Sequence, residues 1–178
     1  LEIPEADWKE LERLGSDKRI VAIGETGLDN YRSLSPVESQ RESFRRHIRL
    51  AVALDKPLIV HNRDADSDVL RWLKEEGRGK ASGVFHCFSS TLDTAKAAVD
   101  LGFYVSFAGN CTYPKNERML EIAREVPIDR LLLETDCPFL APQAKRGRTN
   151  EPAFLRFTAQ AVAAARGIDL NELAERTA

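Results

Sequence analysis

Short apolar runs alternate with amphipathic segments along the whole chain. Between the apolar runs, hydrophobic residues recur at helical spacing, as Val37, Phe44, Ile48 and Ala51 do. The runs themselves read as buried strands because they are short, continuous and rich in β-branched residues. They lie near residues 20–24, 57–61, 82–86, 103–107 and 130–134. Strands that alternate with helices in this way predict an α/β protein with a parallel sheet and outer helices.

The boundaries of the helices follow from breakers and capping residues. The first helix is expected over residues 5–14, and a helix ending near Leu54 follows a capping box at Ser35-Pro36-Val37-Glu38, with Pro36 at its first position. Within that second helix His47 is interpreted as a packing residue. Further helices are predicted over residues 66–76, 91–101, 116–126, 152–166 and 169–176.

Residue types that bind metals come directly after four of the predicted strands. They are Glu25, His61, His86 and Asp136. Barrels of parallel strands carry their catalytic groups at the carboxyl ends of several strands. A carboxylate at the end of a buried strand also needs a cation, since desolvating an unpaired charge is costly. The pattern therefore predicts a divalent-metal site in a TIM-type (β/α) barrel.

Length and composition limit the fold and its partners. The chain has 178 residues, whereas a complete barrel of this type needs about 250, so we expect one partial barrel domain over residues 1–178. A net charge of -2 argues against bulk adhesion to nucleic acid and leaves only a local patch. Three cysteines without a CxxC pair imply no disulfide framework. With neither a membrane span nor a signal peptide visible, we expect a cytoplasmic monomer with no membrane partner.

Four motifs in order resemble one known family. They are GETGLD at residues 24–29, HNRDA from His61, FHCFS from Phe85 and ETDCPF from Glu134. Together they closely resemble the TatD family of metal-dependent hydrolases, and the stretch 146–152 resembles the basic loop of that family. The resemblance implies an amidohydrolase-like barrel that acts as a divalent-metal-dependent deoxyribonuclease. It also implies exonucleolytic cleavage of DNA, in some members with activity on RNA.

The resemblance also implies a role for each ligand. Glu25 would be shared by two divalent ions (Mg, Mn or Zn), His61 and His86 would bind the second ion, and Asp136 would bind the first and act as the base for the attacking water. Glu25 and Asp136 are thus the expected catalytic residues. Glu134 would share the face of Asp136 if the strand continues, as an outer partner or a further ligand.

The sequence departs from the family pattern at both ends. The family opens with an HxHxD strand that supplies two histidines to the first metal, but this sequence holds only three histidines and no HxH pair. The family's final stretch also extends beyond Ala178. We therefore expect a barrel that lacks its N-terminal βα units and its extreme C-terminus. The length of 178 residues and the usual size of a barrel agree with two absent units.

Candidate substrate contacts lie beside these motifs. Lys145, Arg146 and Arg148 are either a solvated surface run or a phosphate clamp, and their place after the Asp136 strand favours the clamp. Asn150 belongs to the same family-like stretch. Arg63, two residues after His61, either pairs with a neighbouring carboxylate or meets the substrate.

Three functions fit these patterns. The leading hypothesis is a phosphodiesterase in which two metals activate water and stabilise the leaving oxygen. The first alternative is amide or ester hydrolysis on the same metal platform, since fold and ligands do not separate the two. The second is a catalytically impaired chain that acts as a binding module, which the missing HxH motif motivates.

Overall fold

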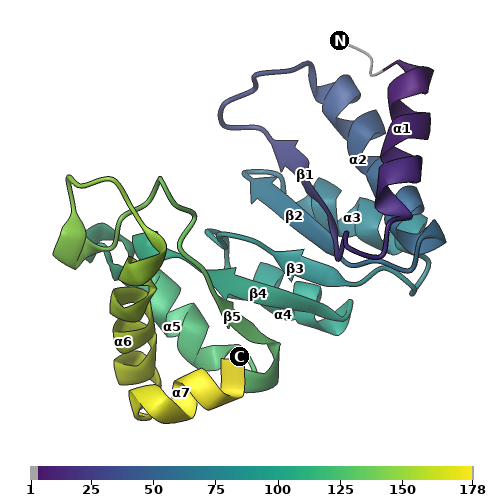
Figure 1. The fold of residues 1–178 in the computed structure, drawn as a ribbon. Helices are drawn as coiled ribbons and strands as arrows, with labels where there is room; N and C mark the ends of the chain where they lie inside the picture. The colour runs from purple at the N-terminus through teal and green to yellow at the C-terminus, as the bar shows by residue number, and fades with distance from the viewer. Residues whose placement is uncertain (1–3, 178) are drawn as a thin grey trace. The chain divides into compact units, whose positions relative to one another are not determined.

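A parallel sheet of five strands forms the framework of the protein. The computed structural model describes residues 4–177. The strands follow one another across the sheet in their order along the chain (Figure 1). They are β1 (Ile23–Asp29), β2 (Leu58–Arg63), β3 (Gly83–Phe85), β4 (Phe103–Phe107) and β5 (Leu131–Leu133). The predicted α/β class and its parallel sheet are confirmed.

Helices connect the strands as the spacing of apolar residues predicts. The α-helices are α1 (Glu5–Gly15), α2 (Val37–Ala53), α3 (Asp66–Gly77), α4 (Leu92–Asp100), α5 (Arg118–Glu125), α6 (Leu155–Arg166) and α7 (Leu170–Thr177). Short 3-10 turns, among them Gln143–Lys145 and Pro152–Phe154, lie in the connections. No helix within residues 4–177 is long and apolar enough to cross a membrane.

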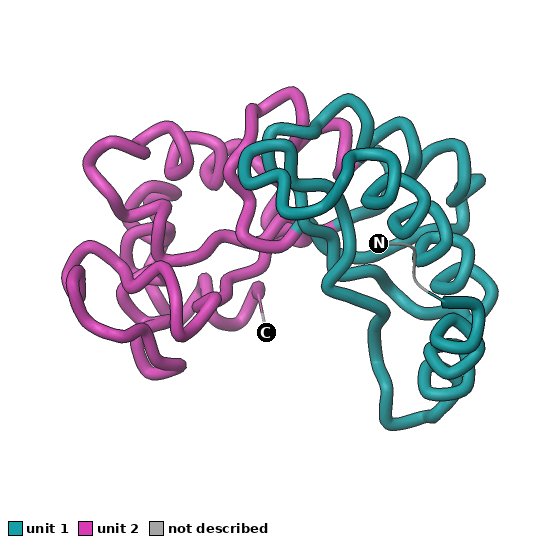
Figure 2. The backbone as a smooth tube through the Cα atoms, turned by 90° about the horizontal axis from the view of Figure 1, so that it is seen from above, with its two compact units in different colours: residues 1–85, 100–103 teal, residues 86–99, 104–178 magenta. Residues whose placement is uncertain are grey.

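The chain divides into two compact units (Figure 2). Unit 1 holds residues 1–85 and 100–103, and unit 2 holds residues 86–99 and 104–178. Each unit has its own strands, covering helices and buried side chains. The prediction of a single domain over residues 1–178 stays a prediction.

The core of unit 1 lies between the strands and α2. Phe44 and Ile48 of α2 and Leu58 and Val60 of β2 are fully buried. These are the alternate positions of β2 and the helical stripe of α2, as expected where a strand face meets an amphipathic helix. The buried stripe of α2 therefore holds the helix on the sheet beside β1.

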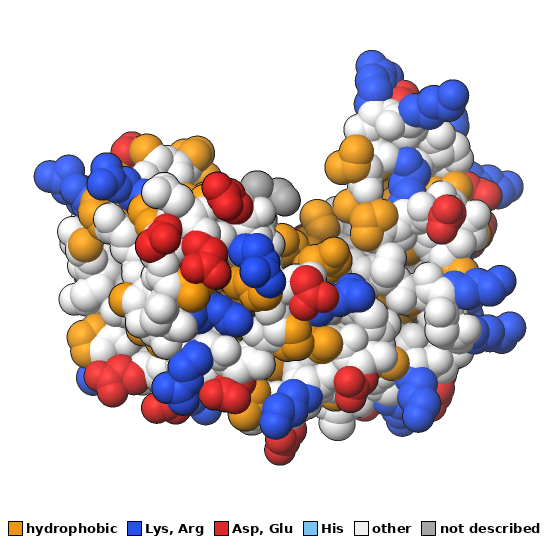
Figure 3. Space-filling model, turned by 90° about the horizontal axis from the view of Figure 1, so that it is seen from below, with side chains coloured by type: hydrophobic (Ala, Val, Ile, Leu, Met, Phe, Trp, Pro, Cys, Tyr) orange, Lys and Arg blue, Asp and Glu red, His pale blue; other side chains and the backbone are white. Residues whose placement is uncertain are grey.

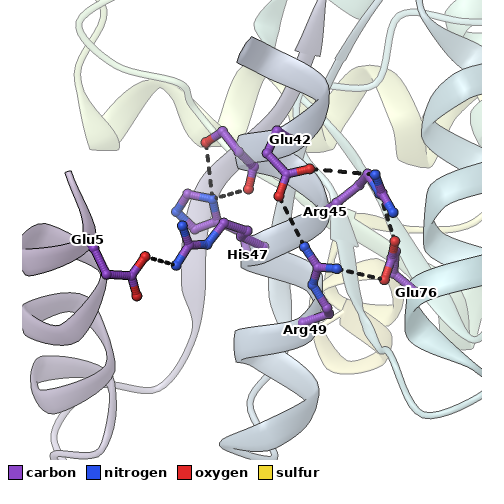
Figure 4. A network of polar contacts seen from close by, with 8 residues as sticks. Glu5, Glu42, Arg45, His47, Arg49 and Glu76 are labelled. Atoms are coloured by element: carbon purple, nitrogen blue, oxygen red, sulfur yellow. Dashed lines mark hydrogen bonds and ion pairs between the residues drawn. The ribbon is translucent and has the colours of Figure 1, made fainter. Parts of the chain in front are cut away.

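Ion pairs and a histidine join the outer surfaces of the unit 1 helices (Figure 4). Arg46 of α2 pairs with Glu5 of α1 at 2.8 Å, and Arg45 of α2 pairs with Glu76 of α3 at 2.7 Å. Exposed pairs of this kind contribute only about 0–1 kcal/mol each. His47 packs edge-on against Trp8 with 4.8 Å between ring centroids, and burial lowers its pKa. The interpretation of His47 as a packing residue is confirmed.

Unit 2 is built around β4, β5, α5 and α6. Phe107, Leu131, Met119 and Val162 are fully buried at its centre. Arg166, the last residue of α6, donates a hydrogen bond to the Val126 carbonyl at 2.8 Å beyond the end of α5. These contacts fix the frame from which the loop after β5 extends.

Two sequence predictions about unit 1 are wrong. The strand predicted over 20–24 begins at Ile23, because the chain first turns through a hydrogen bond from the Ile20 N–H to the Asp17 carbonyl, and Val21 is exposed. The capping box is also absent, since α2 begins at Val37 with Pro36 before it and no side-chain cap. Gln40 instead secures this corner by donating to the Ser35 carbonyl at 2.9 Å.

Candidate metal centre

Glu25 lies in a bulge of β1 rather than after the end of the strand. Ile23 pairs with Leu58 and Thr26 pairs with Val60. Between these two pairs β1 advances by three residues and β2 by two, so β1 holds one extra residue. A bulge of this kind bends the strand and re-aims a side chain, and such bulges occur often beside functional sites. The extra residue is therefore the local reason that Glu25 leaves the regular alternation of the strand.

Glycines on both sides of Glu25 allow β1 to approach β2 closely. A Cβ atom on Gly27 would lie 1.8 Å from the carbonyl oxygen of His61, and one on Gly24 would lie 2.7 Å from Cβ of Ile59. Gly27 also has a φ of 154°, which side chains disfavour. The two glycines of the GETGLD motif thus serve the geometry that sets Glu25 beside His61.

Glu25 and His61 meet across this junction. Oε1 of Glu25 lies 2.8 Å from Nδ1 of His61. The Glu25 side chain is 50% exposed, so the expectation of a desolvated carboxylate is wrong. Its exposure has a structural reason, because the bulge turns it away from the packed face and toward a cavity of about 750 Å³ in unit 1. This cavity is also lined by Trp8, Arg46 and His47.

Asp29 holds the other side of the His61 ring. Its Oδ2 lies 3.2 Å from Nε2 of His61, and its Oδ1 accepts the backbone N–H groups of Tyr31 at 3.0 Å and Arg32 at 2.7 Å. Burial raises the pKa of Asp29, but the hydrogen bonds from Arg32 and His61 outweigh it, so the net pKa is lowered. The Asp29 carboxylate accepts a hydrogen bond from Nε2–H of His61, and Nδ1, the nitrogen that faces Glu25, is then the proposed metal-binding nitrogen.

His86 is oriented in a similar way within unit 2. It follows β3, and its Nδ1 lies 3.0 Å from Oε1 of Glu134, which follows β5. The same Oε1 accepts the backbone N–H of Cys87 at 2.9 Å. Glu134 thereby holds one nitrogen of His86 and leaves Nε2 as the nitrogen that can bind a metal.

Asp136 lies in the turn that follows β5. Its φ is 55°, a left-handed conformation, and its carbonyl accepts the N–H of Phe139 at 2.9 Å. The residues after it form a turn instead of a helix, so Asp136 does not cap a helix. Its predicted roles as ligand and base stay predictions.

The basic loop places its three cations in different surroundings. The Lys145 ammonium lies 5.4 and 5.1 Å from the ring centroids of Phe154 and Phe157, and Arg146 stacks on Tyr113 at 3.9 Å. Arg148 is exposed, and its guanidinium makes no hydrogen bond or ion pair with any described residue. Among the three, Arg148 is therefore the cation whose side chain contacts neither an aromatic ring nor a polar partner within the described residues.

Two further predicted substrate residues have structural partners. Asn150 is buried, and its side-chain amide donates to the carbonyls of Thr135 and Phe139 at 2.6 Å each. These bonds tie the basic loop to the turn that carries Asp136. Arg63 stacks on Tyr31 at 4.8 Å, in place of the ion pair considered from the sequence.

Sequence reasoning missed the roles of Asp29 and Tyr31. Asp29 was visible only as the end of the GETGLD motif. Its position two residues beyond Gly27, which pairs with His61, was a usable signal once the register of β1 against β2 was known. Tyr31 carried no such signal, because its exposure depends on the conformation of the loop.

The surface carries no broad area of a single charge on the face that Figure 3 shows. Lys and Arg side chains are interspersed there with Asp and Glu. This distribution agrees with the net charge of -2. A polyanionic ligand would therefore be recognised by local groups and not by a general positive field.

Comparison with known proteins relates the chain to proteins of one family. The model of the family described as TatD related DNase matches residues 2–178. The uncharacterized metal-dependent hydrolase YcfH of Escherichia coli K12 is 46% identical over 171 residues, which are 96% of this chain and 64% of that protein. The uncharacterized metal-dependent hydrolase YabD of Bacillus subtilis is 40% identical, over 99% of this chain and 69% of that protein.

The chain is also similar to a protein named as an exonuclease and to a protein of known structure. The 3'-5' ssDNA/RNA exonuclease TatD of Erwinia tasmaniensis is 37% identical, over 94% of this chain and 67% of that protein. The crystal structure of YjjV, a TatD homolog from Escherichia coli K12, matches with a TM-score of 0.90 at 26% identity, over 98% of this chain and 68% of that chain. The chain thus spans about two thirds of the length of these relatives, and 64% of YcfH. On the family match, the sequence identities and the shared parallel α/β barrel fold, this chain belongs to the TatD related DNase family.

Proposed function

We propose that this chain supplies the site of a divalent-metal-dependent hydrolase that cleaves phosphodiester bonds of DNA or RNA. The observation that carries the proposal is the contact between Glu25 and His61 in the bulge of β1. Glu25 and His61 of unit 1 each offer one ligand atom, and His86 of unit 2 is proposed to offer a third. Asp136 is proposed as the further ligand. The chain is further proposed to work in the cytoplasm as a monomer.

The donor set fits a hard or borderline divalent ion. Carboxylate oxygen and neutral imidazole nitrogen suit Zn and Mn, and carboxylate oxygen alone suits Mg. Both histidines have one ring nitrogen held by a carboxylate outside the proposed ligand set, Asp29 for His61 and Glu134 for His86. Metal-binding histidines almost always have such a partner, which fixes the ring and its tautomer. A histidine that serves only for packing does not need carboxylates at both ring nitrogens, as His61 has in Glu25 and Asp29.

Two ions are proposed, with Glu25 shared between them. Its half-exposed carboxylate has a second oxygen beside the one that faces His61. A carboxylate can bridge two ions because its two oxygens are equivalent acceptors. Asp136 would then hold the ion that His61 and His86 do not.

The residues of the chain divide the work of hydrolysis. Bound divalent ions supply Lewis acidity and an activated water. Asp136 accepts the proton of the attacking water as general base. His61 and His86 keep their rings in place through Asp29 and Glu134, and Arg148 binds a non-reacting phosphate by charge-assisted hydrogen bonds.

A nucleic-acid substrate is favoured over a small amide or ester by two observations. The Arg148 donors are open to a phosphate, and Lys145 and Arg146 stand beside them in the same loop. The Erwinia tasmaniensis relative carries the name of a 3'-5' ssDNA/RNA exonuclease. Removal of nucleotides from one end of a single strand is the mode of cleavage that we propose.

The test compares substrates and one matched pair of variants. The protein is freed of metal with a chelator and reloaded with Mn²⁺, and cleavage of end-labelled single-stranded DNA is followed beside cleavage of small amides and lactones. Glu25→Gln should abolish cleavage, whereas Glu10→Gln, which removes the same charge from the exposed surface of α1, should leave it unchanged. Metal-dependent cleavage of amides with intact DNA would overturn the substrate. Binding of metal with cleavage of neither would favour a binding module.

A further inference from the structure

An exposed tyrosine begins the loop that follows β1. Tyr31 is 67% exposed and lies two residues after Asp29, which holds the His61 ring. Leu34 in the same loop is also exposed. An exposed aromatic side chain leaves apolar surface in contact with water, which is unfavourable. Such a side chain near a reaction site is often used to bind a ligand.

The backbone of this loop is held where it leaves β1. The Asp29 carboxylate accepts the Tyr31 N–H, and Asn30 donates its N–H to the Arg63 carbonyl at 2.9 Å and its side-chain amide to the Asp64 carbonyl at 3.0 Å. Gln40 of α2 accepts the Asp29 N–H at 2.9 Å. Tyr31 is therefore presented to solvent from an ordered support, so little freedom is lost when a ligand binds to it.

Arg63 lies against the Tyr31 ring. The guanidinium carbon is 4.8 Å from the ring centroid, within the range of a cation–π contact. Arg63 is exposed, and within residues 4–177 its side chain makes no hydrogen bond or ion pair. Its planar set of N–H donors is consequently available to a phosphate.

We propose that Tyr31 and Arg63 form a nucleotide subsite for a single strand of nucleic acid. A base stacks on the Tyr31 ring, and Arg63 donates hydrogen bonds to the adjoining phosphate. The inference rests on the proposed function, because it names how that substrate is held. Stacking on an aromatic ring tolerates any base, since every base has a π face, and it suits an enzyme that acts on strands of varied sequence.

Asp29 connects this subsite to the metal ligand. One of its oxygens faces His61, and the other accepts the Tyr31 N–H. The backbone from which Tyr31 extends is therefore held by the same side chain that holds the His61 ring. Asp29 therefore both orients the proposed metal ligand His61 and holds the start of the loop that carries Tyr31.

A matched control is present in unit 2. Tyr104 of β4 is 38% exposed, and Arg130 lies 5.3 Å from its ring centroid. This is the same pair of residue types at a similar separation, but neither residue follows a proposed metal ligand. A variant at Tyr104 therefore reports what an exposed Tyr–Arg pair contributes by itself.

The experiment measures binding of a fluorescently labelled single-stranded oligonucleotide by anisotropy, in chelator so that cleavage does not occur. Tyr31→Ala should weaken binding roughly 5- to 150-fold, the range found when one stacked base loses its platform. Tyr31→Phe should bind within about twofold of the natural protein because the ring remains, and Tyr104→Ala should bind as the natural protein does. Equal affinities for Tyr31→Ala and the natural protein would overturn the subsite.

Two further measurements distinguish the contribution of base stacking from that of the phosphate contact. An oligonucleotide with abasic sites should bind the natural protein less tightly but should bind Tyr31→Ala with no additional loss. Arg63→Gln should lower the slope of log affinity against log salt by about 0.7. If the natural protein neither binds nor cleaves single strands, the proposed function fails. If it cleaves them and Tyr31→Ala is unaltered, only the subsite fails.

Discussion

The surroundings of His61 in unit 1 differ from those of His86 in unit 2. Asp29 uses both of its oxygens, one on His61 and one on backbone N–H groups, and Glu25 lies 2.8 Å from the opposite nitrogen of the His61 ring. Glu134 uses a single oxygen for both His86 and the Cys87 N–H. In each arrangement a carboxylate holds one ring nitrogen, and the other ring nitrogen is the one proposed to bind a metal.

The contrast separates carboxylates that bind a metal from carboxylates that orient a histidine. Glu25 is half exposed and is presented by a bulge, whereas Glu134 is 23% exposed and already accepts two hydrogen bonds. The oxygen of Glu134 that faces His86 already accepts two hydrogen bonds, and the side chain is less exposed than that of Glu25, so it is the less suited of the two to accept an ion. We therefore assign Glu25 to the ligand set and Glu134 to the support of His86.

Removing a proposed ligand should have the largest effect. Glu25→Gln and His61→Ala should lose most binding of Mn²⁺ in isothermal titration, because the first removes the negative charge and one carboxylate oxygen and the second removes the imidazole nitrogen. Glu134→Gln should retain binding, since Gln keeps an oxygen that can accept the Cys87 N–H. Equal loss in Glu25→Gln and Glu134→Gln would erase the distinction drawn between these carboxylates.

Substituting the glycine after the bulge should have the next largest effect. Gly27→Ala forces a Cβ against the His61 carbonyl. The unfavourable φ alone costs on the order of 1–3 kcal/mol, and the clash adds to this, so thermal unfolding should shift to lower temperature. Gly147→Ala is the matched control, because its φ is also positive but nothing lies within 4 Å of the added atom. An equal shift in both variants would mean that the close approach of β1 to β2 does not matter.

Replacing the orienting carboxylates should show the difference in how they use their oxygens. Asp29→Asn keeps one oxygen for the loop but presents an amide to His61, so Mn²⁺ affinity should fall about 10–100-fold, the usual cost of losing a supporting partner. Glu134→Gln should lose less, because its single used oxygen is preserved. Titration of both variants at one pH decides the order, and a larger loss in Glu134→Gln would reverse it.

The basic loop should give the smallest effect. Arg148→Ala should raise the KM for oligonucleotides and lower the slope of log affinity against log salt by about 0.7. The chemical step should change little, because the proposed ligands are untouched. Arg146→Ala serves as a comparison, since that guanidinium already stacks on Tyr113. An unchanged KM and an unchanged salt slope in Arg148→Ala would mean that these cations are a solvated surface run and not a phosphate clamp.

Much of this account could be predicted from residues alone. The strands at Leu58, Phe103 and Leu131 and the helices between them follow from continuous apolar runs and helical periodicity, which depend on local spacing. The candidate ligands Glu25 and His61 could be named because ligand types end successive parallel strands. The two residues, 36 positions apart in the chain, do meet, although Glu25 lies within β1 and His61 within β2 rather than after the ends of these strands.

Other features depended on three-dimensional register and could not be read from the pattern. The bulge at Glu25 arises from a mismatch between β1 and β2, and neither strand shows it alone. The start of β1 at Ile23 reflects a turn held by backbone bonds, which overrode the apolar character of Ile20 and Val21. The capping box failed because Pro36 took the position before the helix instead of its first turn.

The central claim is that Glu25, His61 and His86 hold one divalent ion. The most direct measurement is an anomalous difference map from crystals of the protein loaded with Mn²⁺. The account predicts a peak about 2.0–2.2 Å from Nδ1 of His61, a Glu25 oxygen and Nε2 of His86. A map with no peak beside Nδ1 of His61, or with an ion bound to Nε2 of His61 in place of Asp29, would contradict it.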